Sequence, residues 1–483
     1  MAHDNENWLG GWHRRGFSTP MARIWRAHIL SYKARLRQSA NSGASTAAER
    51  LNRKRFAADK SRKLRRQLLR PHPPHFAHEV VAVRHVIRQA ILDDLYPRRL
   101  KDWRPVHERT QSTGTVLLRD FSFVDEPANT MELLRQIAEM ETTKTEGRLD
   151  FIDPLCLDIG PLLVLQAMHT GMVPLFTGGR ISASVQRVLE MVGLRSALGM
   201  HFVLPAALTS VWPLPFRTRS GQGDTPNRLL RNQTSEVVTT DVVQRINDWL
   251  IELAHVELTP EGERLALQLT GEALDNAERH SDLIFSDGSW SVAGFVARRR
   301  ENNNGDFIYR CHLGLLSIGA SIAESIQSAS PRTTARMGDY VRRHRGTFRR
   351  FSDENLQTVF ALQDGVSRVH GRGGTGLMDI VEFFAALSGT SDPERRRPRL
   401  AIVSGATCIR VQPPYIQGTR SAEPGPKGLR QPRELWFNRQ NDPQFPPDNA
   451  HLISLPARLA GTLITMAWTM DEEFLQGIAR KPK

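Results

Sequence analysis

Cysteine is scarce in this sequence. The 483 residues include only three, Cys156, Cys311 and Cys408, which lie far apart and form no CxxC pair. This usage excludes a disulfide framework and a zinc site recognisable from its spacing. A reducing cytosol therefore fits the chain best.

Long apolar runs are missing as well. The nearest approach, residues 155–176, is interrupted by polar residues and by Pro161, so it is typical of a buried core rather than of a membrane span. The first 30 residues also lack the continuous apolar stretch of a secretory signal. We expect a cytoplasmic protein without membrane contact.

Taken as a whole, the chain after residue 75 has almost no net charge, and the excess of basic residues lies in the head. The net charge is +14, but residues 1–75 hold 17 Lys or Arg against 4 Asp or Glu, which leaves 48 bases and 47 acids elsewhere. We interpret residues 1–75 as a basic arm that is disordered or partly helical. It could bind nucleic acid through phosphates, with Trp8, Trp12 and Trp25 stacking on bases, or be a solvated tail.

The rest of the chain is long enough for two units. Residues 76–205 open with a helical pattern, HEVVAVRHVIRQAILDDLY, and then alternate strands and helices, which predicts a small α/β unit. Residues 206–235 are polar and rich in glycine and proline, so we expect a linker. In residues 236–483, two helical patterns, capped at Thr239–Asp241 and at Thr259, precede a hairpin around ENNNGD and the strands RLAIVSG, TCIRVQ and GTLITMAW.

The first unit resembles the STAS domain of anti-sigma-factor antagonists. The resemblance rests on the closing helix VQRVLEMVGLRSAL and on a strand that ends in aspartate and is followed by a helix. Where those antagonists carry a phosphorylatable serine, this sequence has Asp158, Ile159 and Gly160. The resemblance therefore implies a scaffold or docking role rather than a phosphoacceptor.

The segment GEALDNAERHS carries the first candidate site. Glu272, Asn276 and His280 are spaced by four residues, so they share one face of a helix. The side-chain oxygen of Asn276 can bind Mg²⁺, and Glu272 can orient or deprotonate a water beside a phosphate. A polar helix edge would show the same spacing, so this segment alone leaves both interpretations open.

The segment HGRGGTGLMDIVEFFAALSG carries the second candidate site. Its glycines let the backbone approach a phosphate chain, and Leu377 opens a helix whose N–H groups would face the anion. No GK[ST] follows and the GxGxxG spacing is absent, which excludes a Walker loop and a Rossmann fingerprint.

Together these segments resemble the GHKL superfamily of ATPases and kinases. EALDNAERHS is similar to its N-box, in the version of histidine kinases and anti-sigma-factor kinases, and GRGGTGL is similar to its second glycine box. The resemblance covers roughly residues 236–473. It implies a Bergerat-type α/β sandwich, a mixed sheet with helices on one side, preceded by the STAS-like unit and the basic arm, with ATP and Mg²⁺ as cofactors.

Carried over by position, the resemblance implies that Glu272 polarises a water or a substrate hydroxyl and that Asn276 is a magnesium ligand. Residues 323–370, which are rich in arginine, would form a lid over the phosphates. The implied nucleotide-binding residues are Asn276, Arg279, His280, Ser317, Gly319, Gly371, Gly373, Gly374, Thr375, Gly376 and Leu377.

The first glycine box departs from the family pattern D-x-G-x-G. In LLSIGASIAESI, aligning Gly319 with the first glycine puts Ser317 in place of the aspartate that accepts from the adenine amino group. A serine is a weaker acceptor than a buried carboxylate, so we expect weaker or altered base selectivity.

A complete sensor histidine kinase would also need a phosphoacceptor histidine. The nearest match, His78 followed by Glu79, lacks the usual proline, which disfavours autophosphorylation. We expect an ATP-binding protein that transfers a phosphoryl group to a protein or hydrolyses ATP. The alternatives are a nucleotide-gated scaffold without turnover and a nucleic-acid-associated ATPase that uses the arm. A protein partner is expected in the first two cases, and a homodimer is compatible with all three.

Overall fold

The computed structural model describes most of the chain from residue 80 onward. The described ranges are 80–83, 86–104, 106–108, 114–143, 147–172, 179–201, 211–219, 234–280, 288–300, 307–348, 351–366, 376–388, 398–420, 432–470 and 472–477. The basic arm 1–75, His78 and most of the second glycine box lie outside them.

The protein is a mixed α/β protein built on a five-stranded sheet with strand order β5-β7-β8-β12-β9. The strands are β5 (Val211–Arg219), β7 (Ser289–Arg300), β8 (Phe307–Ile318), β12 (Leu452–Thr469) and β9 (Arg399–Val411). Every neighbouring pair in this sheet is antiparallel. The expectation of a mixed sheet is therefore wrong for the described strands.

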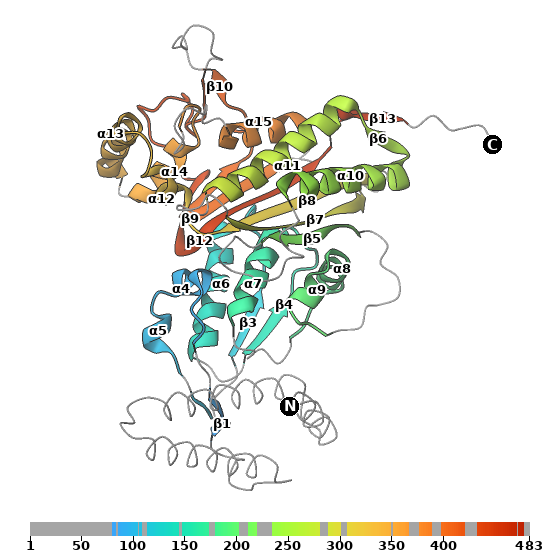
Figure 1. Ribbon diagram of the computed structural model, residues 1–483, viewed down its shortest axis with the longest axis vertical. Helices are drawn as coiled ribbons and strands as arrows, with labels where there is room; N and C mark the ends of the chain where they lie inside the picture. Colours follow the sequence, from blue (N-terminus) through green and yellow to red (C-terminus); the bar gives the residue numbers. More distant parts are fainter. Residues whose placement is uncertain are drawn as a thin grey trace, which may run out of the picture.

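Three long helices cover one face of the sheet (Figure 1). They are α10 (Ser235–Ala254), α11 (Pro260–His280) and α15 (Gly376–Ser388). Three further helices lie at the β9 end of this layer: α12 (Ile322–Ile326), α13 (Pro331–Phe348) and α14 (Asp353–Ala361). The apolar side chains of this layer form one buried cluster with the sheet.

The first unit covers the opposite face of the same sheet (Figure 1). It contains α4 (Ala90–Leu95), α5 (Arg99–Asp102), α6 (Pro127–Thr143), α7 (Gly160–Gly171), α8 (Ala183–Val192), α9 (Leu194–Ala197) and the parallel pair β3 (Gly114–Leu118) and β4 (Gly147–Phe151). Its core is continuous with the sheet residues that point toward it. The expectation of helices on one side only is therefore wrong.

The strands show why both faces must be covered. In β9, Leu400 and Ile402 belong to the cluster under α10, α11 and α15, whereas Ala401 and Val403 belong to the cluster of the first unit. Successive residues of a strand point to opposite faces, so a continuous apolar run indicates a sheet that is buried twice.

Two local predictions were wrong. Residues 80–83, expected to be helical, form β1 (Val80–Val83), which pairs with β2 (Val106–Glu108) and contains three β-branched valines. Residues 211–219, placed in a linker, form the edge strand β5, whose antiparallel register with β7 shifts between Leu214 and Arg217, beside Pro213 and Pro215.

Other boundaries agree with the sequence patterns or differ slightly. Helix α11 follows Thr259 as expected, and the Thr259 hydroxyl accepts from the Gly262 N–H at 3.2 Å. Helix α10 is capped earlier than expected, by Thr234, whose side chain accepts from Val237. The break between α8 and α9 lies at Gly193, whose φ of 88° suits glycine.

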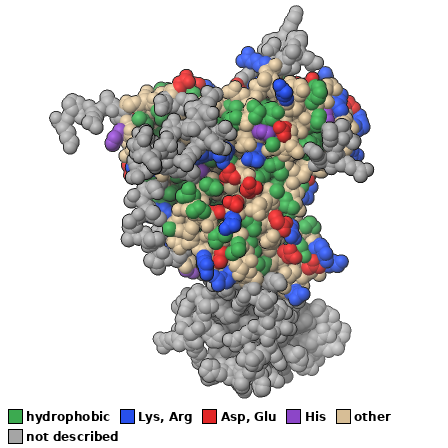
Figure 2. Space-filling view, turned by 180° about the vertical axis from the view of Figure 1, so that it is seen from behind, with side chains coloured by type: hydrophobic (Ala, Val, Ile, Leu, Met, Phe, Trp, Pro, Cys, Tyr) green, Lys and Arg blue, Asp and Glu red, His purple; other side chains and the backbone are tan. Residues whose placement is uncertain are grey.

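Four short strands complete the described elements: β6 (Val256–Leu258), which pairs with β13 (Leu475–Gly477), and β10 (Thr419–Arg420), which pairs with β11 (Arg433–Glu434). A single 3₁₀ turn, η2, spans Glu472–Phe474. Across the described ranges, no helix is both long and apolar enough to cross a membrane. The described part of the face seen in Figure 2 carries acidic and basic side chains interspersed, which agrees with the even charge balance after residue 75.

Candidate nucleotide-binding pocket

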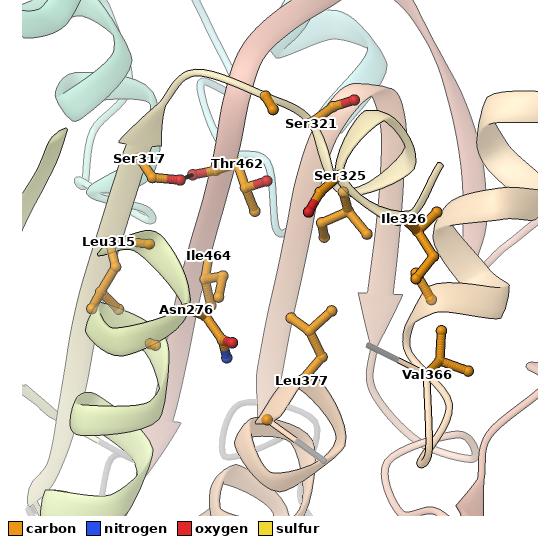
Figure 3. A pocket seen from close by; sticks show the side chains of 16 residues that line it. Asn276, Leu315, Ser317, Ser321, Ser325, Ile326, Val366, Leu377, Thr462 and Ile464 are labelled. Carbon is orange, nitrogen blue, oxygen red and sulfur yellow. Dashed lines mark hydrogen bonds between the residues drawn. The ribbon is translucent and has the colours of Figure 1, made fainter. Parts of the chain in front are cut away.

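A pocket opens between the helical layer and the sheet, where α11 and α15 approach β8 and β12 (Figure 3). Its cavity volume is about 110 Å³, and it opens to solvent at its mouth. Its lining residues are Ala273, Asn276, Ala277, Leu315, Ser317, Ala320, Ser321, Ile322, Ser325, Ile326, Ala361, Val366, Gly376, Leu377, Thr462 and Ile464.

Most of the lining is apolar. The small side chains Ala273 and Ala277 of α11 leave open space in front of the sheet, and Leu315 and Ile464 form the wall behind them. Figure 3 shows Asn276 on α11 and Leu377 at the start of α15 on facing sides of this space. A flat apolar group with polar substituents would fit such a lining.

Asn276 carries the clearest unmet polar group of the pocket. Its Nδ2 atom is buried and has no hydrogen-bond partner among the described residues. Buried polar atoms in native proteins are nearly always satisfied by protein, water or ligand. The amide is therefore available to a molecule that enters the pocket.

Gly376 brings the start of α15 against this amide. A Cβ atom built on Gly376 would lie 2.8 Å from Asn276 Nδ2, 3.0 Å from Asn276 Oδ1 and 3.1 Å from Glu272 Oε2. The N-box and the end of the second glycine box, about 100 residues apart in the sequence, thus meet at one point. Only a residue without a side chain fits there without displacing the amide.

Glu272 lies one turn before Asn276 on α11 and is half-buried; it is not among the lining residues, but its carboxylate lies beside Gly376. Burial raises the pKa of its carboxyl, and the negative charges of Asp379 on α15 and of Asp275 on its own helix raise it further, while Arg279 opposes them. A carboxylate with a raised pKa holds a proton more readily than an exposed one, which suits a general base.

Hydroxyl groups form the polar wall on the sheet. Ser317 and Thr462 are paired in the β8–β12 register, and the Ser317 hydroxyl donates to the Thr462 carbonyl at 3.2 Å (Figure 3). The Thr462 hydroxyl lies 2.8 Å from the Ser404 hydroxyl, which also accepts from the Ile322 N–H at 2.8 Å. The wall therefore offers neutral groups where the resembled family carries a carboxylate.

Gly319 follows β8 with a φ of 149°, in the region that favours glycine. It is not among the lining residues, whereas its neighbours Ala320 and Ser321 are. Ser321 caps α12 in a capping box with Glu324.

Arg279 is not brought into the pocket. Its guanidinium donates to Asp275 at 2.5 Å, and Asp275 also accepts from the Ser235 hydroxyl at 3.0 Å. His280 is the last residue of α11, and its side chain lies outside the described part of the structure. The predicted phosphate contacts of these two residues stay predictions.

The second glycine box is described only in part. Gly376 and Leu377 line the pocket, while Gly371, Gly373, Gly374 and Thr375 lie outside the described residues.

The segment expected to be a lid contains α12, α13 and α14 over its described part. Among the described side chains of α13, none lines the pocket; Arg342 pairs with Asp339, and Arg345 pairs with Asp353 at 3.1 Å. In contrast, α12 supplies Ile322 and Ile326 to the lining. The contribution to the pocket therefore comes from α12 and from the end of α14 rather than from the arginine-rich helix.

Among the described side chains, no group of three or more His, Cys, Asp or Glu could hold a metal ion by itself. Asn276 is thus the protein ligand that the sequence analysis offers for Mg²⁺, and Mg²⁺ commonly takes its other ligands from phosphates and water. Sequence reasoning missed Thr462 and Ser404; the signal was a polar residue inside each of the apolar runs GTLITMAW and LAIVSG.

Comparisons with protein-family models, with curated proteins and with solved structures found no match to this chain.

Proposed function

We propose that the chain binds ATP together with Mg²⁺ in the pocket between α11, α15 and the sheet. The observation that carries this proposal is the meeting of Asn276, whose buried Nδ2 lacks a described partner, with Gly376 at the start of α15. Helix α15 has 13 residues, and the N–H groups of its first turn favour an anion such as a phosphate. The resemblance to the N-box and glycine box of the GHKL superfamily supports the same assignment.

The residues present fit the nucleotide by their chemistry. The apolar lining of Ala273, Leu315 and Ile464 suits the base, with the Ser317 and Thr462 hydroxyls at its polar edge. Asn276 would hold Mg²⁺ through its side-chain oxygen while its Nδ2 faces the bound molecule. The magnesium ion would neutralise phosphate charge, and Glu272 would orient or deprotonate a water or a protein hydroxyl.

The second candidate function is a nucleotide-gated scaffold without turnover. The neutral wall of Ser317 and Thr462 favours it, because hydroxyls select a base less strongly than a buried carboxylate. The first unit packs on the same sheet, so nucleotide binding in such a scaffold would change the surface that the first unit presents to a partner.

Calorimetry on the full chain tests the proposal. ATP, ADP and GTP are titrated with and without Mg²⁺ into the wild type, into Asn276→Ala and into Thr240→Ala, a control on the exposed side of α10. We expect magnesium-dependent ATP binding that Asn276→Ala abolishes and Thr240→Ala leaves unchanged. Absence of binding by the wild type for all three nucleotides would overturn the proposal.

A further inference from the structure

Arg433 joins three acidic side chains beside the pocket. It is only 3% exposed, and it donates to both oxygens of Asp364, from Nε at 2.7 Å and from Nη2 at 3.0 Å. Its Nη2 also donates to Asp379 at 2.6 Å, and its Nη1 contacts Glu382. Such a planar two-pronged contact fixes geometry as well as charge.

The acids that Arg433 binds belong to two different segments of the pocket wall. Asp364 lies two residues before Val366, a lining residue at the end of the α14 segment. Asp379 lies three residues after Gly376, in the first turn of α15. One guanidinium therefore spans the two chain segments that form this side of the pocket.

Arg433 itself comes from the long connection between β9 and β12, which is firmly attached at this point. The Arg433 N–H donates to Asp364 at 2.8 Å, and the Asp364 N–H donates to the Arg433 carbonyl at 3.2 Å. Two residues on, Leu435 exchanges hydrogen bonds with the Gln363 side chain at 2.7 and 2.9 Å. The connection thus positions the guanidinium through backbone as well as side-chain contacts.

We propose that Arg433 is a positioning residue of the nucleotide pocket, which holds Val366 and Gly376 in place by binding Asp364 and Asp379 together. This inference rests on the proposed nucleotide-binding function and names a residue that no sequence motif identified. Without the guanidinium, the Asp364 and Asp379 carboxylates, which are 6% and 14% exposed, would repel each other, and the start of α15 would move relative to Asn276.

The same contact links Arg433 to Glu272. The charged groups that act on Glu272 are Asp379 from α15 and Asp275 and Arg279 from its own helix. Asp379 raises the pKa of Glu272, and Arg433 partly neutralises Asp379. A change at Arg433 should therefore be visible in the ionisation of Glu272, which a purely structural arginine would not affect.

Arg433→Lys keeps the charge and loses the two-pronged contact, and Arg99→Lys is a matched control. Arg99 is also buried and also pairs with two acids, Asp93 and Glu141, but it lies in the first unit away from the pocket. We expect Arg433→Lys to weaken Mg-ATP binding by roughly tenfold or more, while Arg99→Lys binds as the wild type does. The thermal midpoints of the two variants show whether both remain folded.

Asp379→Asn is the second variant, for use if Arg433→Lys does not fold. It removes the charge of one partner of Arg433 and keeps the Arg433–Asp364 pair. In a carbon-13 titration of the glutamate carboxyls, with the Glu272 signal assigned through Glu272→Gln, Asp379→Asn should lower the pKa of Glu272. Arg433→Met should raise the pKa of Glu272, because it removes the positive charge that partly neutralises Asp379.

The outcomes separate the two proposals. Wild-type binding of Mg-ATP with an unchanged Kd in Arg433→Lys or, where that variant does not fold, in Asp379→Asn would overturn the role of Arg433 alone. No binding by the wild type would overturn the proposed function and, with it, this role.

Discussion

Gly376 touches the amide of Asn276: a Cβ at position 376 would stand 2.8 Å from Asn276 Nδ2. Because the clashing atoms are the end of a side chain, a methyl group there can be accommodated by rotating the amide. The change should leave the fold intact and weaken nucleotide binding in the pocket.

Gly376→Ala is therefore expected to lower Mg-ATP affinity by roughly tenfold while the thermal midpoint stays within a few degrees of the wild type. Gly338→Ala is the matched control, since it also lies in a helix and its Cβ would meet only Arg342 Nη1, at 3.4 Å. Calorimetry and circular dichroism measure the two effects. Equal affinity in Gly376→Ala and the wild type would contradict the assignment of this contact to the site.

The variant Glu272→Gln distinguishes an enzyme from a nucleotide-gated scaffold without turnover. If Glu272 acts as general base, the amide should reduce turnover by about 10²–10⁴-fold and leave Mg-ATP affinity nearly unchanged. Glu261→Gln, on the exposed first turn of the same helix, is the control. Release of phosphate and of ADP measures turnover by hydrolysis and by transfer, and a wild type that binds ATP but releases neither would favour the scaffold.

The pH dependence of turnover follows from the ionisation of Glu272. Burial and Asp379 raise the pKa of this carboxyl, and the base acts only when it is deprotonated. Activity should therefore fall on acidification at a higher pH than an ordinary glutamate would give, and Asp379→Asn should move this fall to lower pH. An acid limb that is the same in Asp379→Asn and the wild type would argue against Glu272 as the base.

The interface between the first unit and the sheet carries a buried carboxylate, Asp158. It accepts hydrogen bonds from the Thr465 hydroxyl of β12 and from the N–H groups of Phe123 and Gly160, both at 2.8 Å. Burial raises its pKa to about 6, although these donors oppose the shift. Since the pKa is higher in the folded than in the unfolded chain, the stability that this group contributes is largest at low pH and is lost as the pH rises through about 6.

Thr465→Val removes one donor to the charged form of Asp158. At pH 8 we expect a loss of about 1.5–3 kcal/mol in the free energy of unfolding, and the loss should shrink as the pH falls below about 6. Thr469→Val, at the end of the same strand, is the control, because its Oγ1 has no hydrogen-bond partner among the described residues. Denaturant unfolding at several pH values measures both, and a pH-independent difference would refute the role of Asp158.

The sequence predicted the two helices of the site, and the structure shows that they meet at Asn276 and Gly376. The spacing from Glu272 to Asn276 fixed one face of α11, and the predicted helix start at Leu377 is within one residue of the observed start of α15 at Gly376, because both signals are local. Ser317 was placed at the pocket by the resemblance, through the alignment of Gly319 with the first glycine box, and it lines the pocket.

Features that depend on long-range pairing could not be predicted. The strand β5 was hidden by Pro213 and Pro215, which favour a loop when no partner strand is known. The packing of the first unit on the sheet was visible only as continuous apolar runs, which fit a parallel sheet equally well. Arg433 carried no signal at all, since its three partners come from two other segments.

Photo-cross-linking with an azido-adenine analogue of ATP tests the central claim most directly, because it reports where the nucleotide lies. With Mg²⁺ and the full chain, we predict a label that excess ATP removes, on peptides from residues 310–326 or 452–470, and its loss in Asn276→Ala. An ATP-competed label on peptides that do not line the pocket, or none anywhere, would contradict the account.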